Sequence, residues 1–147
     1  VIIAQGGRFG GWSFYARDGL LKFAYNVLGI DEYRVEAKQP IPQGEHQVRA
    51  EFAYDGGGIG QGGNVTLYYD GQKVGEGRVE ETQGVIFSTD ETTDVGYEFG
   101  TPVTPDYTIE TSRFTGKLEW VQIDLGEDDH DHMIDPDHVI HVAMSRQ

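Results

Sequence analysis

The chain has 147 residues, enough for one domain with a sizeable core. Its 25 Asp and Glu against 11 Lys and Arg give a formal net charge of −14, which repels nucleic-acid phosphates and anionic membrane surfaces, so neither is expected as a partner. There is no cysteine, which excludes disulfides, thiolate nucleophiles and zinc–thiolate sites.

The chain opens on an apolar run at 1–4, which predicts a strand entered part-way and hence a piece of a longer protein. Apolar and polar residues then alternate over 12–17 and again over 21–25. Between these runs stands Asp18-Gly19, a dipeptide that suits the positive φ angles of a type I′ hairpin. A further strand is predicted around 33–37, ending before the proline-containing turn at 40–44 because proline cannot donate to a sheet ladder.

Alternation returns over 46–54, with Val48, Ala50, Phe52 and Tyr54 expected to face inward. The glycine-rich segment 55–63 is too long for a tight turn. Beyond it the alternation resumes at 65–69, and Asp70-Gly71 predicts a second hairpin leading into Val74 and Val79.

The polar stretch 88–112 contains Thr-Pro-Val-Thr-Pro and cannot be regular sheet; loops of this length are usually functional or disordered. A strand is predicted again at 114–125, and 139–144 is predicted to be a final strand or a tail packed on the body. No apolar run approaches the roughly 20 residues of a membrane-spanning helix, so a soluble protein, periplasmic or cytoplasmic, is expected. The pattern as a whole predicts an all-β, antiparallel two-sheet β-sandwich as a single domain over 1–147.

Four stretches resemble the C-terminal domain of large bacterial arylsulfatases: AQGGRFGGWSFYARDGLLKFAYN, VRAEFAYDGGGIGQGGNVTLYYDGQKVGEGRVE, DETTDVGYEFGTPVTPDY and FTGKLEWVQIDLGEDDHDHMIDPDHVIHVAMSRQ. The hairpin DGLLKFAYN and the segment that follows it also resemble the concanavalin A-like, laminin-G-like jelly roll. This resemblance implies a parent enzyme that hydrolyses sulfate esters with a formylglycine beside a divalent cation. The chain has neither a cysteine nor Ser-x-Pro-x-Arg, so no catalytic residue is carried over.

An acidic and histidine-rich stretch runs from 126 to 141. Imidazole and carboxylate groups suit zinc, nickel or manganese, and Asp129, His130 and His132 are the predicted ligands. A solvated acidic loop or a docking tail explains the same residues without a metal.

A second acidic group lies in the long polar stretch. Asp90, Glu91, Asp94 and Asp106 supply the hard oxygen ligands that Ca²⁺ prefers, which makes calcium the one cofactor expected, although turn and capping roles explain Asp and Thr equally well.

Ligand-binding residues are predicted at Arg8, Trp12, Tyr54 and Asp55. Arg8 suits a sulfate group, or else an interdomain salt bridge or plain exposure. The glycine loop that Tyr54 and Asp55 introduce is either a flexible connection or a place where a backbone or sugar ring approaches closely.

These observations leave three functions open. The first is a non-catalytic accessory domain that packs on a sulfatase catalytic domain or self-associates, supporting stability, assembly or substrate entrance. The second is an independent carbohydrate-binding module for acidic or sulfated glycans, with calcium offsetting the acidic surface. The third is a glycoside hydrolase, although neither a Ser-His-Asp arrangement nor a Glu-x-Asp-x-x-Glu pattern is present.

Overall fold

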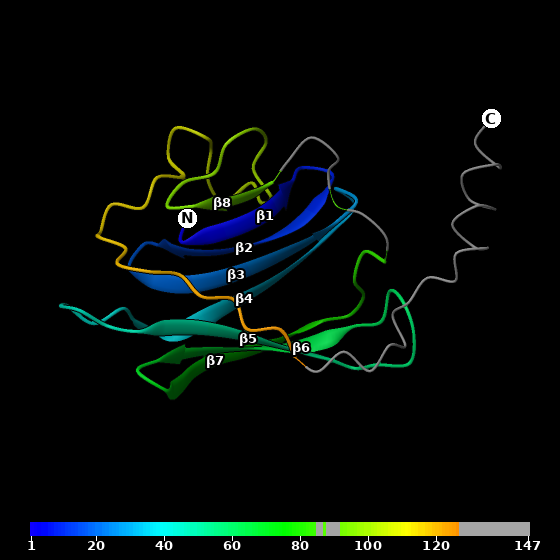
Figure 1. Cartoon of the computed structure of the whole chain (residues 1–147), viewed down its shortest axis with the longest axis horizontal. Helices are drawn as coiled ribbons and strands as arrows, with labels where there is room; N and C mark the ends of the chain where they lie inside the picture. The colour runs from blue at the N-terminus through cyan, green and yellow to red at the C-terminus, as the bar shows by residue number, and fades with distance from the viewer. Residues whose placement is uncertain (85–86, 88–91, 127–147) are drawn as a thin grey trace.

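The computed structural model describes residues 1–84, 87 and 92–126, which form two antiparallel sheets (Figure 1). The five-stranded sheet has the order β4-β3-β2-β1-β8 and the three-stranded sheet the order β5-β6-β7. The strands are β1 (Ile3–Gly7), β2 (Gly10–Arg17), β3 (Leu20–Val27), β4 (Asp31–Pro40), β5 (Val48–Tyr54), β6 (Gly63–Tyr69), β7 (Gln72–Val79) and β8 (Thr93–Val95). Within the described residues there is no helix, and thus none able to cross a bilayer. The predicted all-β, two-sheet antiparallel fold is confirmed.

Both predicted hairpin turns are present. Asp18 and Gly19 have φ angles of 54° and 76°, and Asp70 and Gly71 have 47° and 80°, the left-handed pair that a type I′ turn requires. The sequence did not indicate the equivalent turn between β3 and β4, since its first left-handed residue is Leu28 (φ 56°), a residue with a steric penalty there.

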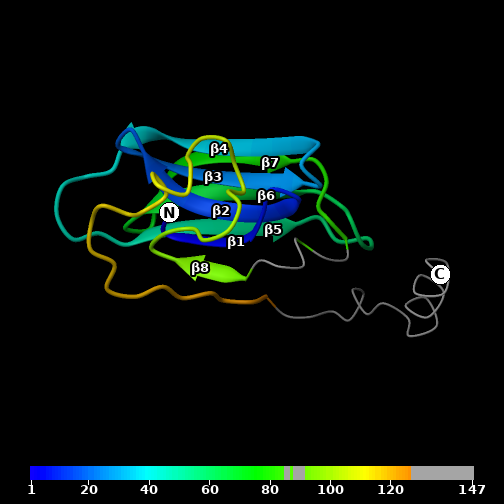
Figure 2. The same ribbon diagram turned by 90° about the horizontal axis from the view of Figure 1, so that it is seen from above.

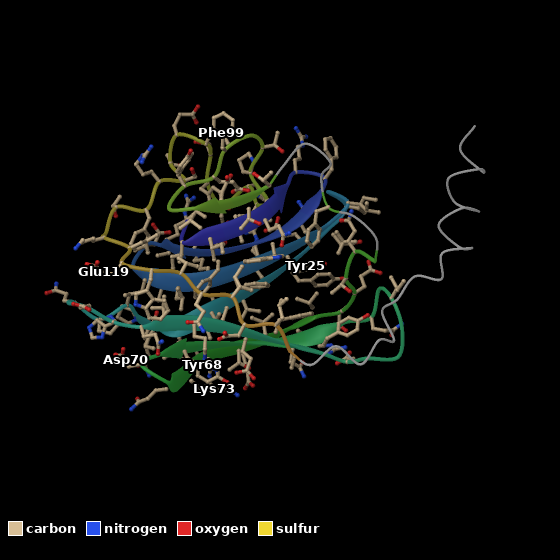
Figure 3. All side chains as sticks on the ribbon, in the orientation of Figure 1. Tyr25, Tyr68, Asp70, Lys73, Phe99 and Glu119 are labelled. Atoms are coloured by element: carbon tan, nitrogen blue, oxygen red, sulfur yellow. The ribbon has the colours of Figure 1, made fainter. Side chains whose placement is uncertain are left out.

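The main core lies between the two sheets. Side chains from β2 and β3 meet side chains from β6 and β7, and the buried members include Phe14, Leu21, Phe23, Tyr25, Val65, Leu67, Tyr69, Val74 and Val79. Figure 2 shows the sheets superposed, with β4 over β7 at one side and β1 over β5 at the other. Figure 3 shows Tyr25 between the sheets, whereas Tyr68 and Lys73 lie on the outer side of the three-stranded sheet.

The sheets approach most closely where β4 meets β7. A Cβ atom on Gly75 would lie 2.6 Å from the carbonyl oxygen of Glu36, and one on Gly77 would lie 2.6 Å from Cγ2 of Val35. Two glycines on β7 therefore let the strands come together at this edge.

The outer face of the five-stranded sheet is also covered. Residues 96–112 fold over it, and Tyr107 packs with Tyr15 and Ala24 in a second, smaller cluster. The Tyr107 hydroxyl donates to Oγ of buried Ser13 at 2.7 Å. Part of the long polar segment, residues 96–112, therefore packs on the sheet and is held there by contacts with its side chains. We call residues 96–112 the cover.

Residues 113–126, called the strap below, run along the open side of the sandwich opposite the β4/β7 edge (Figures 1 and 2). Phe114, Leu118 and Val121 pack against the main core. The predicted strand at 114–125 is wrong: these inward positions are spaced by four and three residues, not two, and the strap belongs to neither sheet. The final strand or packed tail predicted at 139–144 lies outside the described residues.

Candidate functional site

One end of the sandwich gathers four connecting segments, and we call it the loop end. It comprises the β1–β2 hairpin, the β3–β4 turn, the glycine loop 55–63 and residues 80–84. The Asn26 side chain donates to the Arg8 carbonyl at 3.2 Å, the Leu28 amide donates to Oε1 of Gln83 at 3.4 Å, and the Thr82 amide donates to the Gly60 carbonyl at 3.3 Å. These bonds tie the four segments into one surface.

The glycine loop is held in a defined shape by Tyr54. The Tyr54 hydroxyl donates to the Gly58 carbonyl and accepts from the Gln61 amide at 3.0 Å. Gly56, Gly57, Gly58 and Gly60 all have φ angles between 73° and 113°, so the left-handed backbone explains the glycines. A Cβ atom at 56, 57 or 58 would meet nothing within 4 Å, so the loop leaves open space beside itself.

A pocket of about 250 Å³ lies against this loop. Its lining residues are Tyr54, Ile59, Gly60, Thr82, Gln83 and Gly84. The Thr82 hydroxyl donates to the Gln61 carbonyl at 2.7 Å, and the Gln83 amide donates to the Tyr25 hydroxyl at 3.1 Å. Burial raises the pKa of Tyr25, which stays protonated at neutral pH. The described residues that line the pocket are therefore uncharged, and hydrogen bonds hold the loop and residues 82–83 beside it.

The structure places the four predicted ligand-binding residues in different surroundings. Tyr54 lines the pocket, and Arg8 lies exposed in the β1–β2 hairpin at the same end of the sandwich. Asp55 is paired with Arg78, whose Nη1 lies 2.9 Å from Oδ1, and this partner lowers the pKa of Asp55. Trp12 instead packs against the core, stacked on Phe23 with its Nε1 donating to Gln5 at 3.2 Å.

The predicted calcium ligands are only partly described. Asp106 accepts hydrogen bonds from Tyr15 at 2.8 Å and from Arg34 at 2.7 Å, so its oxygens already face a cation and a hydroxyl. Asp94, on β8, accepts from the Phe99 amide at 2.6 Å. Asp90 and Glu91 lie outside the described residues. Among the residues that are described, no three His, Asp or Glu side chains gather as a metal site would require.

The alternative metal ligands Asp129, His130 and His132 also lie outside the described residues. Both metal sites therefore stay predictions from the sequence.

A buried carboxylate that sequence reasoning missed is Glu98, a fully buried residue of the cover itself. Its Oε1 accepts the Val103 amide at 2.9 Å. Burial, followed by the nearby Glu98 charge, raises the pKa of Tyr107. The sequence around position 98 does not predict that Glu98 is buried, because the residues that surround it are brought together only when the cover folds.

Large exposed apolar side chains fall into two groups. One is at the loop end and on β5 beside it: Phe9, Leu28, Ile30, Phe52 and Ile59. The other lies on β8, the start of the cover and the strap: Val95, Tyr97, Phe99, Trp120, Ile123 and Leu125. Figure 3 shows Phe99 pointing outward from the cover.

We call Trp120, Ile123 and Leu125 the strap surface. Their exposed fractions are 63%, 56% and 89%, whereas Leu118 and Val121 of the same segment are half-buried. The strap thus closes the core with some of its side chains and presents other large apolar ones to the outside.

No protein-family model matches the chain, and no curated protein or solved structure matches it. The likeness to arylsulfatases therefore rests on the sequence stretches alone.

Proposed function

We propose that this chain is a non-catalytic accessory β-sandwich of an arylsulfatase-like protein. It packs through the strap surface on a sulfatase catalytic domain or on a second copy of itself, and so supports stability, assembly or the substrate entrance. The observation that carries the proposal is the exposure of Trp120, Ile123 and Leu125 on a segment that already closes the core.

The energetics favour a covered strap surface. Burying a Leu or Ile side chain fully stabilises by about 1.5 to 3 kcal/mol, and an aromatic anchor such as Trp is typical of the centre of interfaces. Large apolar side chains that stay exposed on an otherwise acidic protein are typical of contact with another domain or chain.

The same proposal includes a concanavalin A-like jelly roll as the finer fold. The described strands form two meanders, β1 to β4 and β5 to β7, and the chain then returns to place β8 beside β1. A long return of this kind is characteristic of Greek-key topologies, from which jelly rolls are built.

In this proposal the parent protein, a sulfuric ester hydrolase, carries out the catalysis, and this chain does not. Two of the described candidate acids form ion pairs within the fold, Asp55 with Arg78 and Asp106 with Arg34, and Asp94 accepts the Phe99 amide. The glycan-binding alternative depends on a different part of the molecule, the loop end, and is independent of the strap.

The test is sedimentation of the full 147-residue chain, alone and mixed with a separately produced arylsulfatase catalytic domain. We expect concentration-dependent association in one of the two samples, lost in a variant with Trp120→Ser, Ile123→Ser and Leu125→Ser. The matched control, Phe9→Ser with Ile30→Ser, removes exposed apolar side chains from the loop end and retains association. The proposal is overturned if the chain sediments as a monomer and does not bind the catalytic domain.

A further inference from the structure

We propose that the tips of two hairpins at the loop end bind a cationic amphipathic segment of a partner protein, in which Lys or Arg flanks apolar side chains. The apolar part of the site consists of Phe9 in the β1–β2 hairpin and of Leu28 and Ile30 in the β3–β4 turn, and we call it the tip surface. The strap surface takes no part in this binding, so the two proposals are tested separately.

The first step is that the two tips are fixed to each other. The Asn26 side-chain amide donates to the Arg8 carbonyl at 3.2 Å, and Asn26 Oδ1 accepts the Gly29 amide at 2.7 Å. A Cβ atom at Gly29 would lie 2.8 Å from the same Arg8 carbonyl oxygen, so the two backbones are in close contact there. The tip surface is therefore in place before a partner binds, which reduces the entropy lost on binding.

The second step concerns the residue type at position 28. Leu28 has a left-handed φ of 56°, as Asp18 and Asp70 have at the first position of their turns. Aspartate tolerates this conformation, whereas leucine has a steric penalty there. The Leu28 side chain is 55% exposed, so burial within the fold offsets little of that penalty. Strained residues are typical of binding sites, and contact with a partner explains an apolar side chain at this position.

The third step is the exposure of the neighbouring side chains. Phe9 is 63% exposed and Ile30 is 79% exposed. Phe9 follows Arg8, and Leu28 and Ile30 flank Gly29, so the contact between the two backbones places all three apolar residues on neighbouring turns. Large apolar side chains exposed together mark interaction sites, and aromatic residues are enriched in protein interfaces.

The fourth step is the charge beside these tips. Three exposed carboxylates border the tip surface, and we call them the acidic rim: Asp31, Glu80 and Glu81. Asp31 follows Ile30 directly, and Glu81 lies two residues before Gln83, whose Oε1 accepts the Leu28 amide at 3.4 Å. All three charges also act on Tyr33, because burial, followed by the charges of Glu81, Asp31 and Glu80, raises the pKa of that hydroxyl.

The acidic rim is only partly neutralised within the fold. Glu80 lies 3.5 Å from Nε of Arg78, whereas Asp31 and Glu81 form no ion pair with any described residue, and Arg8 is an exposed cation at the same end. Complementary charge across an interface determines which partner is accepted, so an apolar surface with an acidic rim selects apolar side chains flanked by Lys or Arg. A second copy of this chain, with its net charge of −14, is repelled.

The experiment is an amide NMR titration of the full chain at about 150 mM salt, which screens long-range attraction between unlike charges. The probe is the capped peptide Lys-Leu-Lys-Leu-Lys-Leu-Lys, and two control peptides replace every Lys with Glu or every Leu with Ser. We expect saturable shifts at the amides of Phe9, Leu28 and Ile30 with the probe and with neither control. Phosphatidylcholine vesicles are expected to leave these amides unchanged.

Leu28→Asn removes the apolar side chain and keeps the turn and the charge. Because Asn accepts the left-handed conformation, we expect an equal or higher melting temperature, while probe binding weakens at least about tenfold. Glu81→Gln is expected to weaken binding about twofold to fivefold, as for an exposed ion pair. Its matched control is Glu45→Gln, which changes an exposed carboxylate in the connection between β4 and β5 at the other end of the sandwich and retains binding.

Four results would each overturn the proposal. They are the absence of saturable shifts at the tip surface, equal binding of a control peptide or of the vesicles, full binding by Leu28→Asn, and a lower melting temperature of that variant. The strap variant with Trp120→Ser, Ile123→Ser and Leu125→Ser is expected to bind the probe normally, which separates this site from the docking function. Loss of binding in the strap variant would place the peptide on the strap and also overturn the proposal.

Discussion

Asp106 accepts a hydrogen bond from the hydroxyl of Tyr15 at 2.8 Å, although the two residues lie 91 positions apart in the chain. Tyr15 belongs to β2 and Asp106 to the cover, so this bond holds the cover on the sheet. Arg34 on β4 reaches the second carboxylate oxygen at 2.7 Å, and Lys22 on β3 lies 3.8 Å away. Burial raises the pKa of Tyr15 well above 10, with the Asp106 hydrogen bond adding to it, so the hydroxyl remains a donor.

Tyr15→Phe removes that donor without changing the ring. Because a hydrogen bond to a charged group contributes roughly 1.5 to 3 kcal/mol, we expect the free energy of unfolding to fall by about 1.5 kcal/mol. Urea unfolding measures it. The matched control is Tyr68→Phe on the outer face of the three-stranded sheet, where the change is expected to stay within about 0.5 kcal/mol. Equal effects of the two variants would contradict the anchoring role of Asp106.

The β6–β7 turn carries a pH-sensitive pair. Nδ1 of His46 lies 2.7 Å from Oδ2 of Asp70, and this contact raises the pKa of His46 and lowers that of Asp70. His46 therefore contributes stability fully below its unfolded pKa of about 6.5 and loses it as the pH rises through the higher folded pKa. Asp70 contributes stability fully above the unfolded aspartate pKa of about 3.9, and this contribution is lost as the pH falls through its lowered folded pKa.

Asp70→Asn tests this pair, because Asn tolerates the positive φ and still offers an oxygen to the Gln47 amide. We expect the pKa of His46 to fall toward 6.5, as followed by NMR titration of its ring protons. Asp18→Asn, at the other type I′ turn, serves as the control and leaves that pKa unchanged. A His46 pKa that does not fall in Asp70→Asn would refute the assignment.

Alanine at Gly75 is expected to disturb the β4/β7 edge. The new Cβ would lie 2.6 Å from the Glu36 carbonyl oxygen and 3.1 Å from Cα of Ala37, both backbone atoms, so overpacking is expected to cost about 3 kcal/mol. Gly77→Ala meets the Val35 side chain instead and is expected to cost about 1 kcal/mol. Gly126→Ala, with no atom within 4 Å, is the neutral control in thermal and urea unfolding.

Inward and outward side chains of the strap are expected to have different effects on the stability of the chain. Leu118→Ala removes a half-buried side chain from the core and is expected to lower the free energy of unfolding of the isolated chain by about 1.5 kcal/mol, below the 2 to 5 kcal/mol of fully buried sites. Trp120→Ala is expected to change it by less than about 0.5 kcal/mol, because that side chain is exposed. A larger loss in Trp120→Ala than in Leu118→Ala, measured by urea unfolding, would invert the proposed faces of the strap.

Tyr54→Phe is expected to accelerate amide hydrogen exchange at Gln61, whose amide donates to the Tyr54 hydroxyl. Amides in the middle of β6 are the internal reference, since their exchange follows global unfolding. Unchanged exchange at Gln61 would mean that the glycine loop is braced by other contacts.

The local sequence determined most of the strands and two of the turns. Alternation predicted the inward faces of β3 and β6, where Leu21 and Leu67 are fully buried, because side chains of a strand point to opposite faces in turn. Asp18-Gly19 and Asp70-Gly71 predicted their hairpins because few residues accept two left-handed φ angles in succession. The glycine-rich composition of 55–63 predicted a loop there, because the segment is too long for a tight turn.

Only the tertiary structure decided what the remaining segments do. The cover and the strap have little periodicity of their own, and their positions follow from contacts such as Tyr15 with Asp106 and Phe114 with Gly96, which join residues from separate segments. The alternation of β2 could not predict that both of its faces are buried. The segment that covers the second face is polar, and its own sequence has no apolar periodicity that would reveal the contact. Nor could it show that Asp106 faces Arg34, because an ion pair across strands depends on which segments the fold brings together and on nothing in the neighbouring sequence.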